Sequence, residues 1–282
     1  MPGRERSTGL FPWIVAALVA AALAAGCTAD FTPRSVLADT RVLALEAVTP
    51  AGADVPRVDA GPGEAVAFRA RTWPEGEAGA GSWTFCPFTV GSQAGFACAV
   101  PQCETPAGSG AEATVVPSAL ALDCVAALSA GGAPLPPGVP SQLPESVTTL
   151  LRYRVTGADG LAREAVQVVL LYPGGAPVPR IAPPAFGPIR IGGVDVALGG
   201  AGPALGSGQE LTVSAAVDAS VTVSFFTTAG RFDFDRATGP DANVKLKHED
   251  VGAATEATLY LVARDLRGGE TVAGPFTVPI GP

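Results

Sequence analysis

Leu211-Thr-Val-Ser-Ala-Ala-Val217 and Val221-Thr-Val-Ser-Phe225 are the stretches that decide the fold. Apolar side chains recur at every second position in both, which is the period of a β-strand with one buried face. The same alternation runs through the other regular parts of the chain. Ser118–Leu128 is apolar enough for a short helix, but prolines and glycines interrupt the region around it. The sequence therefore predicts an all-β protein.

Two halves of the chain repeat one order of elements. Gly61-Pro-Gly-Glu-Ala-Val-Ala-Phe-Arg-Ala70 matches Gly206-Ser-Gly-Gln-Glu-Leu-Thr-Val-Ser-Ala215 in its glycines, its polar residue and its inward positions. Each of these stretches predicts a turn that leads into a strand. An aromatic strand follows in each half, Ser82–Cys86 in the first and Val221–Phe226 in the second. A doubled pattern of this kind predicts two similar domains.

Each half closes with a predicted hairpin, in which Asp-Gly or Gly-Gly supplies the positive φ that a tight turn needs. The strands are Leu151–Val155 with Ala165–Tyr172, and Thr258–Val262 with Thr271–Pro279. Short strands separated by turns about every 8–12 residues resemble an immunoglobulin-like β-sandwich. The resemblance implies that Trp83 is a core aromatic residue and that Tyr153 and Tyr260 share one strand position. A jelly roll or a single larger sandwich is the alternative.

The N-terminal segment has the parts of a secretory signal: Arg4 and Arg6, then an apolar run from Trp13 to Ala25. Leu23-Ala-Ala-Gly-Cys27 resembles the lipobox of bacterial lipoproteins, with the leucine one place further upstream than is usual in that family. The resemblance implies cleavage after Gly26 and a diacylglyceryl group on Cys27. The alternative is an ordinary signal peptide in which Cys27 is incidental.

The predicted location follows from that signal. The familiar sorting rule expects an aspartate after the cysteine for retention in the inner membrane, and Thr28 stands there instead. We therefore expect an exported protein that is lipid-anchored in the bacterial outer membrane. A single acyl chain holds a protein only marginally, whereas two or three hold it stably.

Composition argues against one class of partner. The net charge of the chain is −8, and the chain without residues 1–26 has 16 Lys and Arg against 25 Asp and Glu, or −9. Nucleic-acid phosphates recruit Lys and Arg, so this acidic balance argues against nucleic acid. A hydrophobic content of 48% is too high for a disordered chain.

Proline and glycine mark the domain boundaries. Gly174–Pro188 contains five prolines and predicts a semi-stiff, extended linker. We expect a lipidated tether over 27–40, one immunoglobulin-like domain over 41–173 and a second over 189–282. Residues of about 87–145 have no counterpart in the second half and predict an insertion between strands.

Four cysteines remain beside Cys27, namely Cys86, Cys98, Cys103 and Cys124. An even number in an exported chain predicts two disulfides. Three pairings are open, and Cys86–Cys98 with Cys103–Cys124 is favoured because it closes two short loops that do not cross. A zinc site is the alternative, although its usual close cysteine pairs are missing.

Phe88 and Phe96 are candidate ligand contacts in the predicted insertion, because binding residues concentrate on loops. The alternative, which we favour, is that both rings pack beneath the disulfides. Asp233 and Asp235 are calcium candidates on one strand face, and the alternative is a solvated acidic edge neutralised by neighbouring arginines. No cofactor is predicted.

The sequence favours a non-catalytic protein. His248 is the single histidine, and no Gly-x-Ser-x-Gly elbow offers a nucleophile for it. We expect an envelope lipoprotein that serves in adhesion, as a spacer or in a surface assembly, with the membrane and other envelope proteins as partners. The alternative is a periplasmic or surface hydrolase, or a solute-binding accessory, with its site in 87–145.

Overall fold

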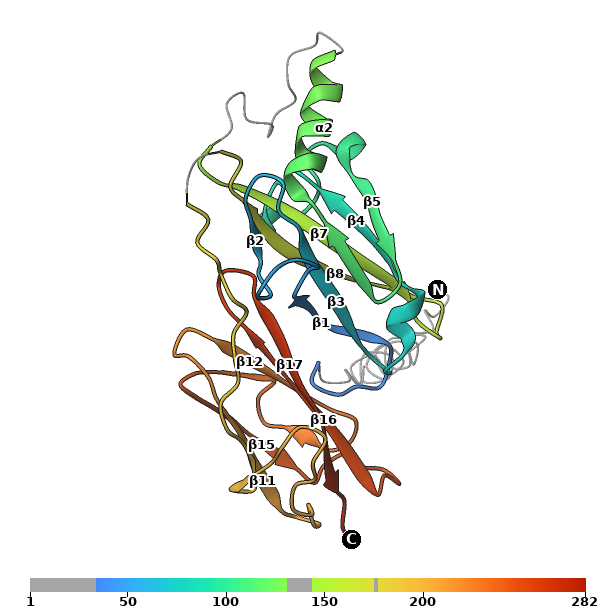
Figure 1. Cartoon of the computed structure of the whole chain (residues 1–282). Coiled ribbons are helices and arrows are strands. Elements are labelled where there is room, and N and C mark those ends of the chain that lie inside the picture. Colours follow the sequence, from blue (N-terminus) through green and yellow to red (C-terminus); the bar gives the residue numbers. More distant parts are fainter. Residues whose placement is uncertain (1–33, 131–143, 175–176) are drawn as a thin grey trace, which may run out of the picture. The chain divides into compact units, whose positions relative to one another are not determined.

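The computed structural model describes residues 34–130, 144–174 and 177–282 (Figure 1). Its regular structure is mostly β, as the alternation predicted. The strands form four sheets that pack around two separate cores, so the fold is that of two β-sandwiches in series.

The first sandwich is made by a three-stranded and a five-stranded sheet. The three-stranded sheet has the order β1 (Arg41–Val48), β3 (Val66–Trp73) and β6 (Glu112–Val115). The five-stranded sheet has the order β2 (Asp59–Ala60), β8 (Ala162–Leu171), β7 (Val147–Thr156), β4 (Ser82–Cys86) and β5 (Thr105–Ser109). Trp83 and Tyr153 pair across β4 and β7, and both are buried in the core between these sheets.

The second sandwich pairs a five-stranded with a four-stranded sheet. The five-stranded sheet has the order β10 (Val194–Asp195), β9 (Ile189–Ile191), β11 (Glu210–Ala216), β15 (Asp241–Lys247) and β13 (Arg231–Phe232). The four-stranded sheet has the order β14 (Arg236–Thr238), β12 (Thr222–Thr227), β16 (Glu256–Arg264) and β17 (Glu270–Pro279). Strict alternation along β15 sends Ala242, Val244 and Leu246 into the core.

The repeat seen in the sequence is present in the structure. The aromatic strand of each half pairs with the first strand of the closing hairpin, β4 with β7 and β12 with β16. Both predicted hairpins, β7–β8 and β16–β17, are confirmed.

Tyr153 and Tyr260 nevertheless face opposite ways. Tyr153 shares the core face of β7 with its neighbours two positions away, whereas Leu259 and Leu261 take the core face of β16 and turn Tyr260 outward. The pairing of β16 with β17 shifts register between Leu259 and Leu261, beside this tyrosine.

Tyr260 belongs to a third apolar cluster, which joins the two sandwiches. Leu43 and Ala44 of β1 and Val262 of β16 are buried in it. Hydrogen bonds cross the same contact, from Leu45 N–H to Glu270 Oε2 over 2.7 Å and from Val272 N–H to Glu46 Oε1 over 2.7 Å. β1 is therefore buried on both faces.

Two predictions about loops need correction. The segment 87–145 is not wholly an insertion, because Thr105–Ser109 and Glu112–Val115 return as β5 and β6 and pair with β4 and β3. These strands are so short that their alternation does not stand out from the prolines and glycines around them.

The Pro-rich stretch has neither helix nor strand over its described residues 177–188, but it is not a free linker. Ile181 is buried in the first core and its carbonyl accepts from Val58 N–H over 3.3 Å. Gly187 N–H donates to Ala216 O over 2.8 Å. Proline removes N–H donors but leaves carbonyl acceptors, so such a stretch can still be fastened to neighbouring elements.

α2 (Pro117–Ala130) lies in the segment where a short helix was considered, and η1 (Glu77–Ala80), η2 (Ser92–Ala94) and η3 (Pro101–Cys103) are short 3₁₀ turns. Across the described residues, these helices fall short of the length and apolar character that a bilayer-spanning helix needs.

Candidate functional site

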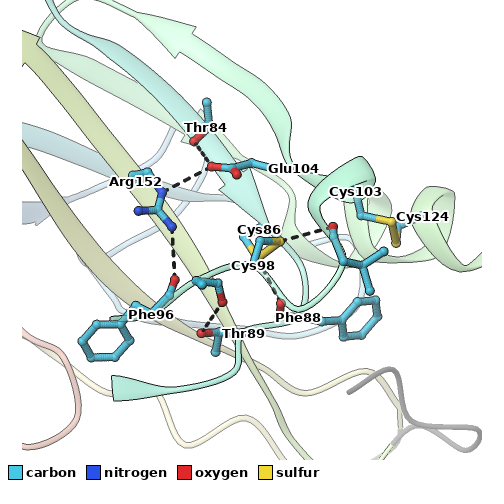
Figure 2. The surroundings of a disulfide bond; sticks show 12 residues. Thr84, Cys86, Phe88, Thr89, Phe96, Cys98, Cys103, Glu104, Cys124 and Arg152 are labelled. Atoms are coloured by element: carbon cyan, nitrogen blue, oxygen red, sulfur yellow. Dashed lines mark hydrogen bonds and ion pairs between the residues drawn. A yellow bond between two sulfur atoms is a disulfide. The ribbon is translucent and has the colours of Figure 1, made fainter. Parts of the chain in front are cut away.

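The cysteine-bearing segment sits at one end of the first sandwich. Its disulfides join Cys86 to Cys98 and Cys103 to Cys124, with Cα–Cα distances of 5.7 and 5.4 Å (Figure 2). This is the pairing that the sequence favoured, which closes two short loops that do not cross. Cys86 is the last residue of β4, so the first disulfide ties the segment to the sheet, while the second ties η3 to α2.

A small apolar core lies beneath these disulfides. Phe88, Val100 and Ala121 pack there with Val147 at the start of β7 and Leu171 at the end of β8. Phe88 is only 3% exposed, so its ring serves packing, which is the alternative that the sequence favoured.

Phe96 lies apart from Phe88 on the other side of the segment (Figure 2). Its side chain is half-buried, and its φ of 56° lies in the left-handed region that non-glycine residues rarely adopt. Phe96 N–H donates to Gly91 O over 2.9 Å, and Phe96 O accepts from Arg152 Nη2 over 3.1 Å. These two bonds fix the backbone at this turn.

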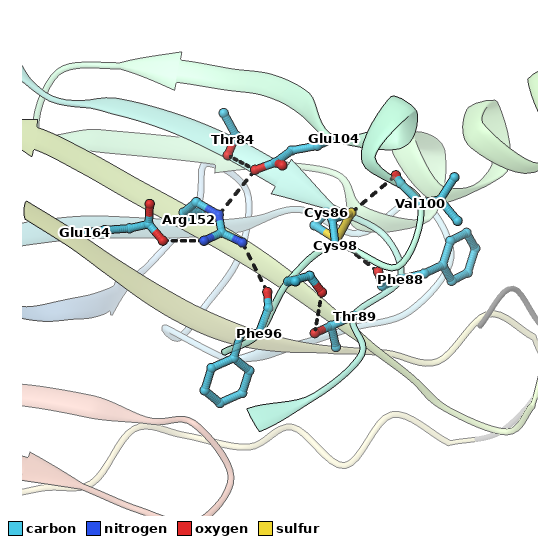
Figure 3. A network of polar contacts seen from close by, with 11 residues as sticks. Thr84, Cys86, Phe88, Thr89, Phe96, Cys98, Val100, Glu104, Arg152 and Glu164 are labelled. Carbon is cyan, nitrogen blue, oxygen red and sulfur yellow. Dashed lines mark hydrogen bonds and ion pairs between the residues drawn. A yellow bond between two sulfur atoms is a disulfide. The ribbon is translucent and has the colours of Figure 1, made fainter. Parts of the chain in front are cut away.

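Arg152 is the polar centre of the segment (Figure 3). Its Nε lies 3.3 Å from Glu104 Oε1, and its Nη1 donates to Glu164. Thr84 Oγ1 donates to Glu104 over 2.7 Å. Arg152 of β7 thus bonds to β8, to the turn at Phe96 and to Glu104, the residue that follows η3. Hydrogen bonds with a charged donor or acceptor are stronger than those between neutral groups.

Sequence reasoning missed Arg152. It stands on the polar side of an alternating strand, where a solvated charge is the ordinary expectation, and its partners come from three separate parts of the chain.

An apolar hollow of about 280 Å³ lies beside α2, lined by Pro62, Ala121, Leu122, Val125 and Pro173, among others. Leu122 is 58% exposed at its rim. The hollow is lined mostly by apolar side chains, some from the predicted insertion and some, such as Pro62 and Pro173, from outside it.

The calcium candidates do not form a site. Asp233 and Asp235 lie in the connection between β13 and β14 and not on a shared strand face, which corrects the prediction. Asp233 Oδ1 accepts from Phe234 N–H and Lys245 N–H, and Asp235 pairs with Arg236 over 3.6 Å. In the described part of the chain, no three His, Cys, Asp or Glu side chains converge as metal ligands would.

His248 is half-buried, and its Nε2 lies 3.0 Å from Gly281 O. Cys27 and the signal residues 1–26 lie outside the described residues.

No protein-family model matches the chain, and no curated protein matches it. Solved structures with a similar arrangement include the fibronectin(III)-like modules of CbhA from Clostridium thermocellum, at 9% identity and a TM-score of 0.28, with 83% of this chain and 94% of that one covered. The D0-D1 domain of intimin has 14% identity and a TM-score of 0.24, with coverage of 86% and 99%. A surface glycan-binding protein of Bacteroides ovatus has 10% identity and a TM-score of 0.24, with coverage of 86% and 47%. At these TM-scores, none of the three bears on function.

Proposed function

We propose that this chain is a non-catalytic, lipid-anchored protein of the bacterial cell envelope that presents its disulfide-bonded segment for adhesion or surface assembly. The lipobox-like Leu23–Cys27 supports the anchor. The two disulfides support export, because disulfides persist in oxidising compartments outside the cytosol.

The placement of the disulfide-bonded segment carries the proposal. The segment packs where β7 begins and β8 ends, at Val147 and Leu171. The other end of the same hairpin meets the start of the first sandwich, because Arg163 Nε donates to Thr40 O over 2.9 Å. Strands of 10 residues place these ends about 30 Å apart. The segment therefore stands well away from Thr40. The predicted tether over 27–40 needs correction at its end, because Ser35 and Leu37 already pair with Thr227 of the second sandwich.

The surface at that end offers apolar contacts. Leu122 on α2 is 58% exposed and Val90 between the disulfide-bonded cysteines is 49% exposed. Both side chains belong to the disulfide-bonded segment, so each is a point at which the segment can meet another molecule.

The first experiment tests the anchor. Inhibition of the signal peptidase that serves lipoproteins should leave a slower-migrating precursor, and Cys27→Ser should move the protein from membranes to the soluble fraction. Unchanged partitioning of Cys27→Ser would refute lipidation.

The second experiment tests the binding surface. Adhesion of cells that display the protein should fall on Leu122→Asp and Val90→Asp, while the matched control Leu266→Asp, whose side chain is 95% exposed elsewhere, should leave it unchanged. Equal adhesion by all variants would refute this use of the segment.

The apolar hollow beside α2 favours the second candidate, a solute-binding accessory or hydrolase with its site in this segment. Turnover in a hydrolase screen that is lost on Glu104→Gln or Asp123→Asn would replace the non-catalytic proposal.

A further inference from the structure

Four arginines gather in one pocket of this acidic protein. The pocket has a volume of about 370 Å³, and its lining consists of Arg34, Arg41, Ser224, Phe226, Asp235, Arg236 and Arg264. A single lining residue is acidic. The concentration of cations runs against the net charge of −8 over the whole chain.

The fold holds these side chains in place through paired backbone. Thr227 N–H donates to Ser35 O over 2.8 Å and Leu37 N–H donates to Thr227 O over 2.7 Å, so the segment that carries Arg34 is fastened to the end of β12. Arg236 opens β14 directly opposite Ser224 of β12.

The arginines differ in how fully they are paired. Arg264 is engaged, since its Nε donates to Glu270 over 2.7 Å and its Nη1 donates to Ser224 Oγ over 3.2 Å. Arg236 has its pairing with Asp235, at 3.6 Å, and its side chain is 60% exposed. Such a long, exposed pair contributes little to stability and leaves the guanidinium available.

Arg34 and Arg41 are the least compensated. Arg41 Nη1 donates to the carbonyl oxygen of Arg34, and no carboxylate among the described residues pairs with either guanidinium. Burial lowers the pKa of Arg41, Asp39 opposes that shift, and Arg163 and Arg34 add to it. Four guanidinium groups are thus set against two paired carboxylates, Asp235 and Glu270, and against Asp39, which acts on Arg41 without pairing with it, so a positive charge of about one to two remains.

We propose that this pocket binds a phosphate group. The planar guanidinium fork matches tetrahedral oxyanions, and its hydrogen bonds to phosphate are charge-assisted. At neutral pH a phosphate monoester carries about −1.5 to −2 charges and the phosphodiester of a phospholipid about −1, so either group would offset positive charge in the pocket.

The phosphate has two possible sources. Arg34 follows Cys27 by seven residues, which reach at most about 25 Å. With Cys27 anchored in the membrane, the headgroup of a membrane phospholipid is therefore within reach of the pocket. Of the whole argument for the pocket, only this choice of source rests on the proposed lipid anchor. The other source is a free phosphate compound.

Two assays with the mature Cys27→Ser chain test the pocket without help from the anchor. The first titrates inorganic phosphate by calorimetry in a phosphate-free buffer. The second floats the protein with vesicles of phosphatidylglycerol in phosphatidylcholine, and with vesicles of phosphatidylcholine alone.

We expect saturable binding of phosphate that Arg34→Gln/Arg236→Gln weakens about tenfold or more, a loss of about 1.4 kcal/mol. Arg231→Gln removes an exposed arginine outside the pocket and should leave binding unchanged. Arg236→Lys keeps the charge without the fork and should fall between the two. All variants should keep the melting temperature of the parent.

Flotation with phosphatidylglycerol that inorganic phosphate competes away would identify the headgroup as the source. Binding of inorganic phosphate without flotation would identify a free phosphate compound. Absence of saturable phosphate binding, or equal weakening by Arg231→Gln, would overturn the proposal. If lipidation fails its own test, the phosphate titration still decides the pocket.

Discussion

Tyr260 lies in the contact between the two sandwiches, so replacing it measures how much that contact contributes to the free energy of unfolding. It is 2% exposed, its ring centroid lies 5.9 Å from that of Trp73, and its hydroxyl donates to Glu75 Oε1 over 3.0 Å. Both partners belong to the first sandwich, whereas Tyr260 belongs to the second. Replacing it perturbs the contact while sparing either core.

The magnitudes follow from those contacts. Tyr260→Phe removes one hydrogen bond to an exposed carboxylate and should lower the free energy of unfolding by about 1 kcal/mol. Tyr260→Ala also removes the buried ring and should lower it by about 3–5 kcal/mol, the usual cost of deleting a large buried aromatic side chain. Tyr172→Phe, at a half-buried position outside the contact, should cost under about 0.5 kcal/mol.

The assay is denaturant unfolding followed by fluorescence and circular dichroism. The parent protein should unfold in one transition, and Tyr260→Ala should separate the two sandwiches into two transitions. A cost below about 1 kcal/mol for Tyr260→Ala, or a cost equal to that of the Tyr172 control, would refute a stabilising contact between the sandwiches.

The same residue predicts a response to alkaline pH. Burial, reinforced by Glu75, raises the pKa of Tyr260, and burial raises the pKa of Tyr153 to about 12. A raised tyrosine pKa contributes stability that is complete below the unfolded value of about 10 and is lost as the pH rises above it. Tyr260→Phe should therefore reduce, but not abolish, the loss of stability above pH ~10.

Three further predictions concern other parts of the chain. The hydrogen bond from Arg180 lowers the pKa of Glu64 to about 2. Glu64→Gln should therefore lower the free energy of unfolding by about 1 kcal/mol at pH 7, where the ion pair is partly screened, and this loss should fade between pH ~4.5 and ~2. A loss independent of pH would contradict this. Replacing Cys103 and Cys124 by alanine should lower stability by about 2–4 kcal/mol and make the segment around α2 sensitive to protease, and intact-mass analysis after alkylation should find no free thiol in the mature parent. Residues 189–282 should fold alone with a cooperative transition, at a lower midpoint than in the whole chain because the fragment exposes the face that carries Tyr260; a fragment without a transition would show that the domain boundary is misplaced.

The sequence alone was enough for the features that depend on local pattern. Alternation along Leu211–Val217 predicted a strand because side chains in a strand point to opposite faces in turn. The Asp-Gly and Gly-Gly turns predicted the two hairpins because glycine adopts positive φ at little cost.

Features that depend on partners distant in sequence had to come from the tertiary structure. The short strands at Thr105–Ser109 and Glu112–Val115 exist because two different sheets offer them edges, and their own alternation is too brief to reveal them. Tyr153 and Tyr260 occupy matching places in the repeat, yet one faces a core and the other a neighbouring sandwich.

The positions of the charged side chains in the fold are the feature that the sequence predicted least well. Counting residues gives an acidic chain, and a count carries no information about where the charges lie. The segment after Arg34 pairs with Thr227, far along the chain, and this pairing brings arginines of both sandwiches into one pocket. Arg152 likewise gains its partners only when β7, β8 and the disulfide-bonded segment meet. The alternating pattern determines which residues form strands, whereas the packing of sheets decides which side chains become neighbours, because electrostatic contacts depend on distance in space and not on separation in sequence.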